Sequence, residues 1–272
     1  TLSIGAGSAS NDWGDAPDTG TGTGTGNYQT VGTDNGAHHL MVANIFLGAC
    51  VDAEANGQPI AGATGDDTNA TTPRFGTCAG GNDDEDGMTI PTLLAGQTAQ
   101  IVASRVATTA CYLNGWIDFN ADGDWTDTGE QVATNVLLAA GNNNLAVSVP
   151  GAAANGTTYA RFRCSTQQNL NPTGVSTDGE VEDYAVTVTG TAVDWGDLPD
   201  TAAGTGTGNY QTLATDSGAA HVLSGVAYMG KCVDSETGTL QNATALADDT
   251  SVTTPRLGAC AAGDDDEDGV TF

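Results

Sequence analysis

Residues 88–190 show the clearest alternation of hydrophobic and polar positions in the chain. Seven short segments there are rich in Val, Ile, Thr and aromatic residues, and turns containing Gly, Asn, Asp or Pro separate them. Seven short strands in about 100 residues predict an antiparallel, immunoglobulin-like β-sandwich. Trp116, on the third segment, is expected to pack in the core between the two sheets. The segments are Met88–Pro91, Ala99–Ser104, Ala110–Phe119, Gln131–Leu138, Asn144–Val149, Thr157–Cys164 and Val181–Val188.

The preceding segment, residues 12–87, lacks this alternation. It contains Thr19–Gly26, a TGTGTGTG run too rich in glycine to pack, and an apolar run at His39–Leu47 that can form a strand or a short helix. We therefore expect irregular loops. The same sequence returns as Asp194–Thr271, which repeats Asp12–Thr89 at an offset of 182 residues without insertion or deletion, with about 45 of 78 positions identical. A fixed long period is typical of an array built from one structural unit.

These patterns divide the chain into four segments. Residues 1–11 are expected to be the end of a preceding repeat or a linker, and residues 12–87 are the first copy of a loop-rich acidic module, module A. Residues 88–190 form the β-sandwich, module B, and residues 191–272 are the second copy of module A, ending at the first strand of a following sandwich. Neither end resembles a natural terminus, because the chain has no initiator Met and no signal peptide. We expect either a cut chain or a window of about one and a half repeats from a longer polymer.

The charge balance excludes several classes of protein. Lys and Arg total 6 against 34 Asp and Glu, which gives a formal net charge of −28. A nucleic-acid-binding protein needs clustered basic residues to displace counterions from phosphate, so that class is excluded. Membrane insertion is not expected either, because no apolar run approaches the ~20 residues of a spanning helix. So much negative charge would repel itself in a compact chain unless the acidic groups are spread over solvent or bind cations.

Six cysteines indicate an oxidising compartment and therefore an extracellular or cell-surface location. A pair separated by 28 residues occurs in each copy of module A, and a third pair lies between the copies. Because a repeated unit should close its own loop, the simplest pairing is within each pair, although six cysteines allow several connectivities. No CxxC motif occurs, so a zinc site is not expected. The expected disulfides are Cys50–Cys78, Cys111–Cys164 and Cys232–Cys260.

The segment Asp118–Asp124 (DFNADGD) is the sharpest local motif. It has oxygen-bearing side chains at every second position and a glycine at the sixth, as in the first half of an EF-hand calcium loop. The second half differs, because the twelfth position is Gly129 and Glu130 follows one residue late. We predict a calcium loop between two strands with Glu130 as a bidentate ligand; the alternative is a polar hairpin without an ion. The other ligands are Asp118, Asn120, Asp122 and Asp124.

Module A contributes further acidic clusters that recur in register in both copies. Adjacent carboxylates do not all stay charged cheaply unless a cation lies between them. Each copy therefore has oxygen ligands for one or two calcium ions, unless the clusters form a solvated acidic surface. Arg74 and Arg256 also recur and can pair with some of these acids. The candidate ligands are Asp12, Asp15, Asp18, Asp52, Glu54, Asp66, Asp67, Asp83, Asp84, Glu85 and Asp86 in the first copy, and Asp194, Asp197, Asp200, Asp234, Glu236, Asp248, Asp249, Asp265, Asp266, Glu267 and Asp268 in the second.

A third acidic group, Gly179–Tyr184 (GEVEDY), enters the last strand segment. Alternation puts Glu180 and Glu182 on one face of the strand and Val181 and Asp183 on the other. The two glutamates can bridge modules through calcium, or they can serve as edge charges that discourage aggregation between sheets. The sequence leaves both interpretations open.

Together these motifs resemble the GEVEDY-type repeat of large secreted bacterial surface proteins. The likeness spans DWGDAPD, Gly36–His39, LGACVDAE, DDEDG, WIDFNADGDW, YARFR and GEVEDY, and it covers nearly the whole chain. The resemblance implies extracellular, calcium-binding β-sandwich repeats in adhesins or fibrous appendages, without a known catalytic role. The second copy departs from the pattern, because it stops before its sandwich.

We therefore expect a structural subunit or repeat of an extracellular bacterial filament or surface fibre. It would be stabilised by calcium and disulfides and would assemble head to tail with itself, as a homopolymer or a tandem array. The alternative is a calcium-dependent adhesin or a carbohydrate-binding module that uses Trp125 or Tyr28 on a glycan. An enzyme is not expected, because the only histidines are His38, His39 and His221, and the correspondence of His39 with His221 favours a local structural role.

Glycosylation is expected at two kinds of site. Three triplets fit the N-linked acceptor pattern, at Asn69, Asn155 and Asn242. The Thr-Gly run, kept in part in the second copy, can carry O-linked sugars or form a bare flexible loop. Its threonines are Thr19, Thr21, Thr23, Thr25, Thr205 and Thr207.

Overall fold

The computed structural model describes residues 10–65, 72–78, 85–190, 193–223, 228–236, 238, 240–247 and 256–259. The chain divides into two compact units, residues 1–190 (unit 1) and residues 191–272 (unit 2). The described residues form strands, turns and loops with two 3₁₀ helices of three residues each, which confirms the all-β class. The first copy of module A and module B share unit 1, and the second copy of module A lies in unit 2.

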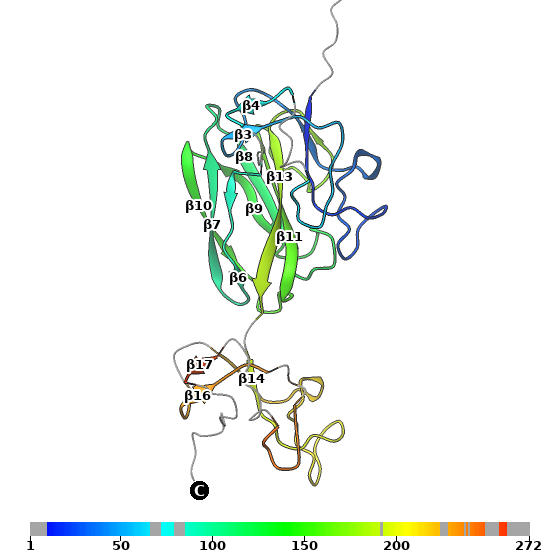
Figure 1. Ribbon diagram of the computed structural model, residues 1–272, viewed down its shortest axis with the longest axis vertical. Helices are drawn as coiled ribbons and strands as arrows, with labels where there is room; N and C mark the ends of the chain where they lie inside the picture. Colours follow the sequence, from blue (N-terminus) through cyan, green and yellow to red (C-terminus); the bar gives the residue numbers. More distant parts are fainter. Residues whose placement is uncertain are drawn as a thin grey trace, which may run out of the picture. The chain divides into compact units, whose positions relative to one another are not determined.

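Module B folds into two sheets (Figure 1). One has the strand order β10–β7–β5 and the other the order β6–β13–β11–β8–β9. Each of the seven predicted segments contains one strand, and the short strands β6 and β12 were not predicted. The bounds are β5 Met88–Thr89, β6 Leu93–Leu94, β7 Thr98–Arg105, β8 Tyr112–Ile117, β9 Gln131–Leu137, β10 Gly141–Ser148, β11 Gly156–Ser165, β12 Val175–Ser176 and β13 Glu180–Thr189.

The two sheets share one hydrophobic core. Ile101 and Leu145 come from the three-stranded sheet, while Leu113, Phe162 and Val186 come from the five-stranded sheet, and all five side chains are buried in the same cluster. This arrangement agrees with a β-sandwich. The sheets are not purely antiparallel, because β13 pairs with β6 in parallel. The immunoglobulin-like strand order remains a prediction.

The first copy of module A is mostly loop, with short elements that pin it to module B. Its elements are β1 Asn11–Trp13, η1 Gly32–Asp34, β2 His38–Leu40, β3 Cys50–Val51 and β4 Phe75–Gly76. Strand β2 pairs antiparallel with β1 and parallel with β12 of module B, so one small sheet contains strands of both modules. Module A lies beside the five-stranded sheet (Figure 1).

Unit 2 repeats the local structure of the first module A. Its elements β14 Val193–Trp195, η2 Ala214–Asp216, β15 Ala220–Val222, β16 Cys232–Val233 and β17 Leu257–Gly258 each lie 182 residues after a counterpart. Hydrogen bonds recur as well. The Trp13 amide donates to Glu54 Oε2 at 3.0 Å, and the Trp195 amide donates to Glu236 Oε2 at 2.9 Å. The sequence repeat is therefore also a repeat of local structure.

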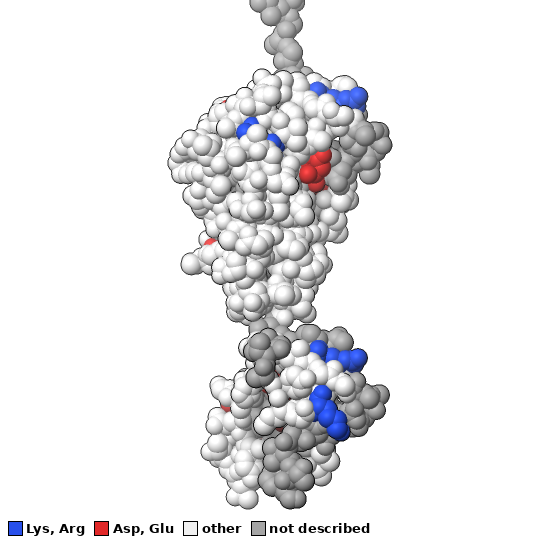
Figure 2. Space-filling view, turned by 90° about the vertical axis from the view of Figure 1, so that its left-hand side faces the viewer, with Lys and Arg blue, Asp and Glu red and all other residues white. Residues whose placement is uncertain are grey.

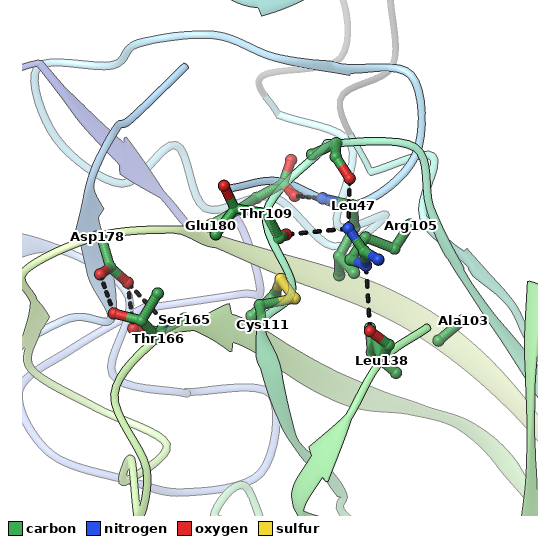
Figure 3. Close-up of a disulfide and its surroundings, with 12 residues drawn as sticks. Leu47, Ala103, Arg105, Thr109, Cys111, Leu138, Ser165, Thr166, Asp178 and Glu180 are labelled. Carbon is green, nitrogen blue, oxygen red and sulfur yellow. Dashed lines mark hydrogen bonds between the residues drawn. A yellow bond between two sulfur atoms is a disulfide. The ribbon is translucent and has the colours of Figure 1, made fainter. Parts of the chain in front are cut away.

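Two of the three predicted disulfides are present. Cys50 pairs with Cys78 and Cys111 with Cys164, and the Cα–Cα separations are 4.9 and 5.5 Å. Figure 3 shows the disulfide at Cys111. Cys232 is also disulfide-bonded, and Cys260 lies outside the described residues. These bonds agree with an oxidising compartment. In the described part of the chain, no helix has the length and apolar character needed to cross a membrane.

Candidate functional site at the junction of module A and the sandwich

The site lies on the outer face of the five-stranded sheet, the face turned away from the sandwich core. Strand β11 alternates, so that Ala160, Phe162 and Cys164 belong to the core and Arg161 and Arg163 point the opposite way. Both arginine side chains are nevertheless almost fully buried. A sheet whose two faces are both buried needs a second covering layer, and module A provides it here.

Arg161 and Asp183 form a buried ion pair at the centre of this face. They are opposite each other on β11 and β13, and Asp183 accepts from Arg161 Nε and Nη2 at 2.7 Å each. The same carboxylate accepts the Ala16 amide of module A at 2.8 Å. Arg161 also donates to the Gln29 carbonyl at 2.8 Å and to Thr30 Oγ1 at 2.9 Å. One ion pair thus fastens two segments of module A to the sandwich.

Aromatic side chains surround this ion pair. The Arg161 guanidinium lies 4.4 Å from the Trp125 ring centroid, and Trp125 stacks on Tyr28 of module A at 4.5 Å. Trp116 belongs to the same cluster, together with Ala16. The prediction that Trp116 packs between the two sheets was wrong, because its register opposite Arg161 places it on the outer face, under module A.

The glycan-stacking prediction for Tyr28 and Trp125 also needs correction. Both side chains are buried against each other, so neither presents a free ring face to a sugar. The Tyr28 hydroxyl instead donates to Asp118 at 2.7 Å. Burial and this carboxylate raise the pKa of Tyr28 well above its usual value.

Arg163 makes a second contact across the junction, to His39 of β2. Arg163 Nε donates to His39 Nε2 at 2.9 Å, and His39 Nδ1 lies 2.7 Å from the Asp178 carbonyl. The imidazole is therefore neutral with its proton on Nδ1, since Nε2 must accept from the guanidinium. Complete burial and the neighbouring Arg163 charge hold the pKa of His39 well below its usual value. The histidine has the structural role that its recurrence predicts.

This neutral histidine predicts a pH-dependent stability. Below about pH 6.5 the unfolded chain protonates His39 and the folded chain does not, so the free energy of unfolding of unit 1 falls as the pH is lowered. We expect His39 to contribute up to about 1.4 kcal/mol per pH unit to this fall in the free energy of unfolding. The measurement is urea unfolding at several pH values, with hydrogen exchange of the β11 amides as the readout. His39→Gln should lose this contribution. His221→Gln, the matched change in unit 2, should keep it, and equal slopes in both variants would contradict the assignment.

The two glutamates of GEVEDY hold module A through its backbone. Glu180 accepts the Leu47 amide, and Glu182 accepts the Gly87 amide at 2.8 Å. Both glutamates are fully buried, so the interpretation as solvent-facing edge charges was wrong. They do connect the modules, and the described contacts are hydrogen bonds to main-chain N–H groups.

The rest of the GEVEDY motif acts at the same junction. The Val181 amide donates to Asp12 of module A at 2.6 Å, and the Tyr184 hydroxyl accepts the Met88 amide at 3.0 Å. Gly179 has φ of +99°, and a Cβ there would lie 1.8 Å from the Cys164 carbonyl oxygen. The motif therefore begins with a glycine because no side chain fits between β13 and β11 at that point.

The buried end of the Asp118 loop is saturated by its own chain. Asp118 accepts the Ala121 amide at 2.6 Å and the Gly123 amide at 2.9 Å, besides the Tyr28 hydroxyl. Ala121 and Gly123 both have positive φ, which closes a tight turn around the carboxylate. This half of the loop matches the polar hairpin that was the alternative to a calcium loop.

Glu130 closes the other end of the loop. It accepts the Phe119 amide at 3.0 Å and the Asp127 amide at 3.2 Å, and burial raises its pKa to about 7. The outer candidates Asn120 and Asp122 are exposed, and the Asn120 amide group donates to Asp122 at 3.1 Å. Among the residues that the structure describes, no three His, Cys, Asp or Glu side chains are placed to bind one metal ion. In this arrangement Asp118 and Glu130 accept main-chain N–H groups of the loop itself.

Acidic side chains in this protein mostly serve as acceptors for loop N–H groups. A loop-rich module has few strand partners for its amides, and a buried amide must find an acceptor. Asp18 accepts Thr30 and Val31, both at 2.9 Å, and Asp15 accepts Gly65 at 2.5 Å. Figure 2 shows few acidic atoms on the face that it presents. Among the described residues, fourteen acidic side chains are buried, namely Asp12, Asp15, Asp34, Asp52, Glu54, Glu85, Asp118, Glu130, Glu180, Glu182, Asp183, Asp197, Asp200 and Asp234.

The acids of the second copy follow the first where they are described. Asp200 accepts the amides of Thr212 and Leu213 at 3.0 and 2.9 Å, and Asp197 accepts Ala247 at 2.5 Å. These bonds repeat those of Asp18 and Asp15. Ten of the predicted ligands lie outside the described residues: Asp66, Asp67, Asp83, Asp84, Asp248, Asp249, Asp265, Asp266, Glu267 and Asp268.

The predicted modification sites lie at the surface wherever they are described. Asn155 is exposed and Asn242 is partly exposed, while Asn69 lies outside the described residues. All six threonines of the Thr-Gly runs are exposed. Their glycosylation stays a prediction. Arg74 and Arg256, proposed from the sequence as ion-pair partners, are both exposed.

Sequence reasoning did not identify the residues that hold the junction together. In the sequence, Arg161 and Arg163 stand out only as part of the YARFR string, and Asp178 belongs to none of the motifs. A signal was available, because only 6 of 272 residues are basic and two of them alternate on one strand. Two arginines on the face opposite Phe162 indicate a second buried, polar layer.

In a comparison with protein-family models, residues 112–187 match the GEVED domain. The matched region runs from β8 almost to the end of β13, so it includes both arginines, Asp183 and the GEVEDY motif. Neither the curated proteins nor the solved structures give a match to this chain. Over residues 112–187, the central part of the sandwich, this chain is therefore similar to the GEVED domain.

Proposed function

We propose that the chain is a structural repeat of an extracellular bacterial filament or surface fibre. The observation that carries the proposal is the duplication of module A, in sequence and in local hydrogen bonds, at an offset of 182 residues. A unit that recurs with its own elements and its own cysteine pair is suited to tandem addition. Head-to-tail contacts between such units produce an extended array rather than a closed particle.

The residues at the junction favour a structural role over catalysis. The buried charged groups are paired with each other or with main-chain amides, as in Arg161–Asp183 and Glu182–Gly87. The buried His39 is fixed between Arg163 and the Asp178 carbonyl, so both of its ring nitrogens are occupied. Disulfides close loops in both modules, which suits a loop-rich protein outside the cell.

Calcium binding is part of the proposal, because buried acidic side chains greatly outnumber buried basic ones. In the part of the chain that the structure describes, fourteen acidic side chains are buried, against the three arginines Arg105, Arg161 and Arg163. Buried carboxylates in such excess favour a bound cation, and calcium prefers carboxylate and carbonyl oxygens. The acidic clusters of module A are the candidate ligands, since the Asp118 loop satisfies its own carboxylates. When bound, the ion would supply positive charge that the basic residues do not.

Electron microscopy of native material that contains this chain tests the proposal. We expect filaments whose axial repeat corresponds to one 182-residue unit, and we expect them to loosen or shed subunits in chelator. Thermal melting of the chain should also shift to lower temperature in chelator, with new proteolysis within residues 19–63. Monodisperse particles in the presence of calcium would contradict the filament, whereas filaments with an unchanged melt in chelator would remove only the calcium.

A further inference from the structure

The two copies of module A differ in which side chains are exposed. Residues that face the interior of the module are buried in both copies, as for Asp15 and Asp197 or Cys50 and Cys232. The module therefore has the same interior in unit 1 and in the described part of unit 2. The differences in exposure lie on another face of the module.

Three large hydrophobic residues that contact module B in the first copy have exposed counterparts in unit 2. In unit 1, Leu47 lies in the sandwich core, Tyr28 packs on Trp116 and Trp125, and Phe46 packs on Ala107. Their counterparts in unit 2 remain large and hydrophobic without being buried. The relative exposures are 2% for Tyr28 and 50% for Tyr210, 6% for Phe46 and 47% for Tyr228, and 0% for Leu47 and 70% for Met229.

The polar contacts and the strand edge of this face show the same difference. His39 is buried against Arg163, whereas its counterpart His221 is exposed. Strand β2 carries β12 of module B on its second edge. In the described part of unit 2, β15 is paired with β14 alone, so the equivalent edge at Ala220–Val222 is open. An open edge beside exposed hydrophobic side chains is typical of an interaction surface.

We propose that this face of unit 2, formed by Tyr210, His221, Val222, Tyr228 and Met229, is the docking surface for a second module B. The partner is identified by the first copy, where the same positions contact the outer face of a GEVED sandwich. A docked module B would offer an Arg163 equivalent to His221, an aromatic pocket to Tyr210 and a β12 equivalent to the β15 edge. This inference deepens the proposed function, and it rests on it for the assumption that repeats of one kind assemble in tandem.

The module B of the chain itself does not fill this role, because the first copy already covers its outer face through Arg161, Arg163 and Asp183. The partner must be a sandwich whose outer face is bare. The partner is a module B joined directly after the second copy, in the order in which Met88 follows Gly87 in unit 1. A copy supplied by another molecule would have to displace its own module A first.

An extended chain tests the docking surface. Residues 91–190 are appended after Phe272, which aligns with Ile90, so that the second copy is followed by a module B in the register of unit 1. The readout is the rate at which peroxide oxidises Met229, measured by mass spectrometry. We expect the rate to fall by about tenfold or more relative to the 272-residue chain, since oxidation would then require the docked modules to open. An unchanged rate would overturn the inference.

Two substitutions separate docking from other effects. Tyr210→Ser should leave the melting of the 272-residue chain unchanged, because the ring is half exposed, but it should restore Met229 oxidation in the extended chain. Leu246→Ser is the matched control, since Leu246 is also exposed but its counterpart Thr64 is exposed in unit 1 as well. It should leave Met229 protected, and equal loss of protection in both variants would contradict the face.

The remaining outcomes identify other occupants. Protection of Met229 in the 272-residue chain as its concentration rises would assign the face to a second copy of this chain and overturn the proposed partner. The test is also separable from the filament proposal. Filaments without Met229 protection in the extended chain would contradict only the proposed docking surface. Met229 protection without filaments in native material would contradict only the filament proposal.

Discussion

Asp183→Asn is expected to lower the free energy of unfolding of unit 1 by about 3–5 kcal/mol, the usual cost of removing one partner from a buried ion pair. The change keeps the shape of the side chain and removes its charge. Arg161 then stays buried with an amide group in place of one carboxylate oxygen that accepted at 2.7 Å. The measurement is urea unfolding, followed by hydrogen exchange at the β11 amides and by the fluorescence of the stacked Tyr28 and Trp125.

The exposed Arg74→Ala in the same unit is the matched control and should change the free energy of unfolding by less than about 0.5 kcal/mol. The double substitution Arg161→Met with Asp183→Leu should recover part of the loss, because it leaves no unpaired charge. Recovery is incomplete, since the Gln29 carbonyl and Thr30 Oγ1 lose their donor. A loss below about 1 kcal/mol for Asp183→Asn would show that the ion pair does not hold the junction.

The strands and disulfides of the sandwich could be predicted because they depend on local patterns. Strand β11 was expected at Thr157–Cys164 and runs from Gly156 to Ser165. The Cys50–Cys78 bond followed from a spacing that the repeat preserves. In both cases the information lies within a single module, where alternation and spacing act directly.

The contacts between modules could not be predicted in this way. Alternation divides β11 into two faces, but it does not say that both faces are covered, so Trp116 was assigned to the wrong layer. The same limit applies to Glu180, whose partner is an amide 133 residues away in sequence. A carboxylate that accepts a distant main-chain N–H leaves no spacing pattern between donor and acceptor. For this reason the sequence does not show which acidic side chains accept main-chain N–H groups.

Removing the Cys111–Cys164 disulfide is expected to lower the free energy of unfolding of unit 1 by about 4 kcal/mol, because the unfolded chain regains the entropy of an open loop between two cysteines that are 53 positions apart in sequence. Both sulfurs are buried in the sandwich core. The measurement is urea unfolding of the Cys111→Ala, Cys164→Ala double variant without reductant, so that the Cys50–Cys78 bond stays intact.

The contacts beside the disulfide predict how the double cysteine variant unfolds. Arg105 donates to the Leu138 carbonyl at 3.2 Å and to the Thr109 carbonyl at 3.0 Å, and it lies beside the disulfide (Figure 3). The loop before β8 therefore keeps its attachment through the Arg105 side chain, and the folded state should survive without the bond. The double variant should unfold in one step at lower urea, with module A and the sandwich still coupled through Arg161 and Asp183. A loss below about 1 kcal/mol, or an early step confined to the sandwich, would show that the disulfide does not stabilise the unit as a whole.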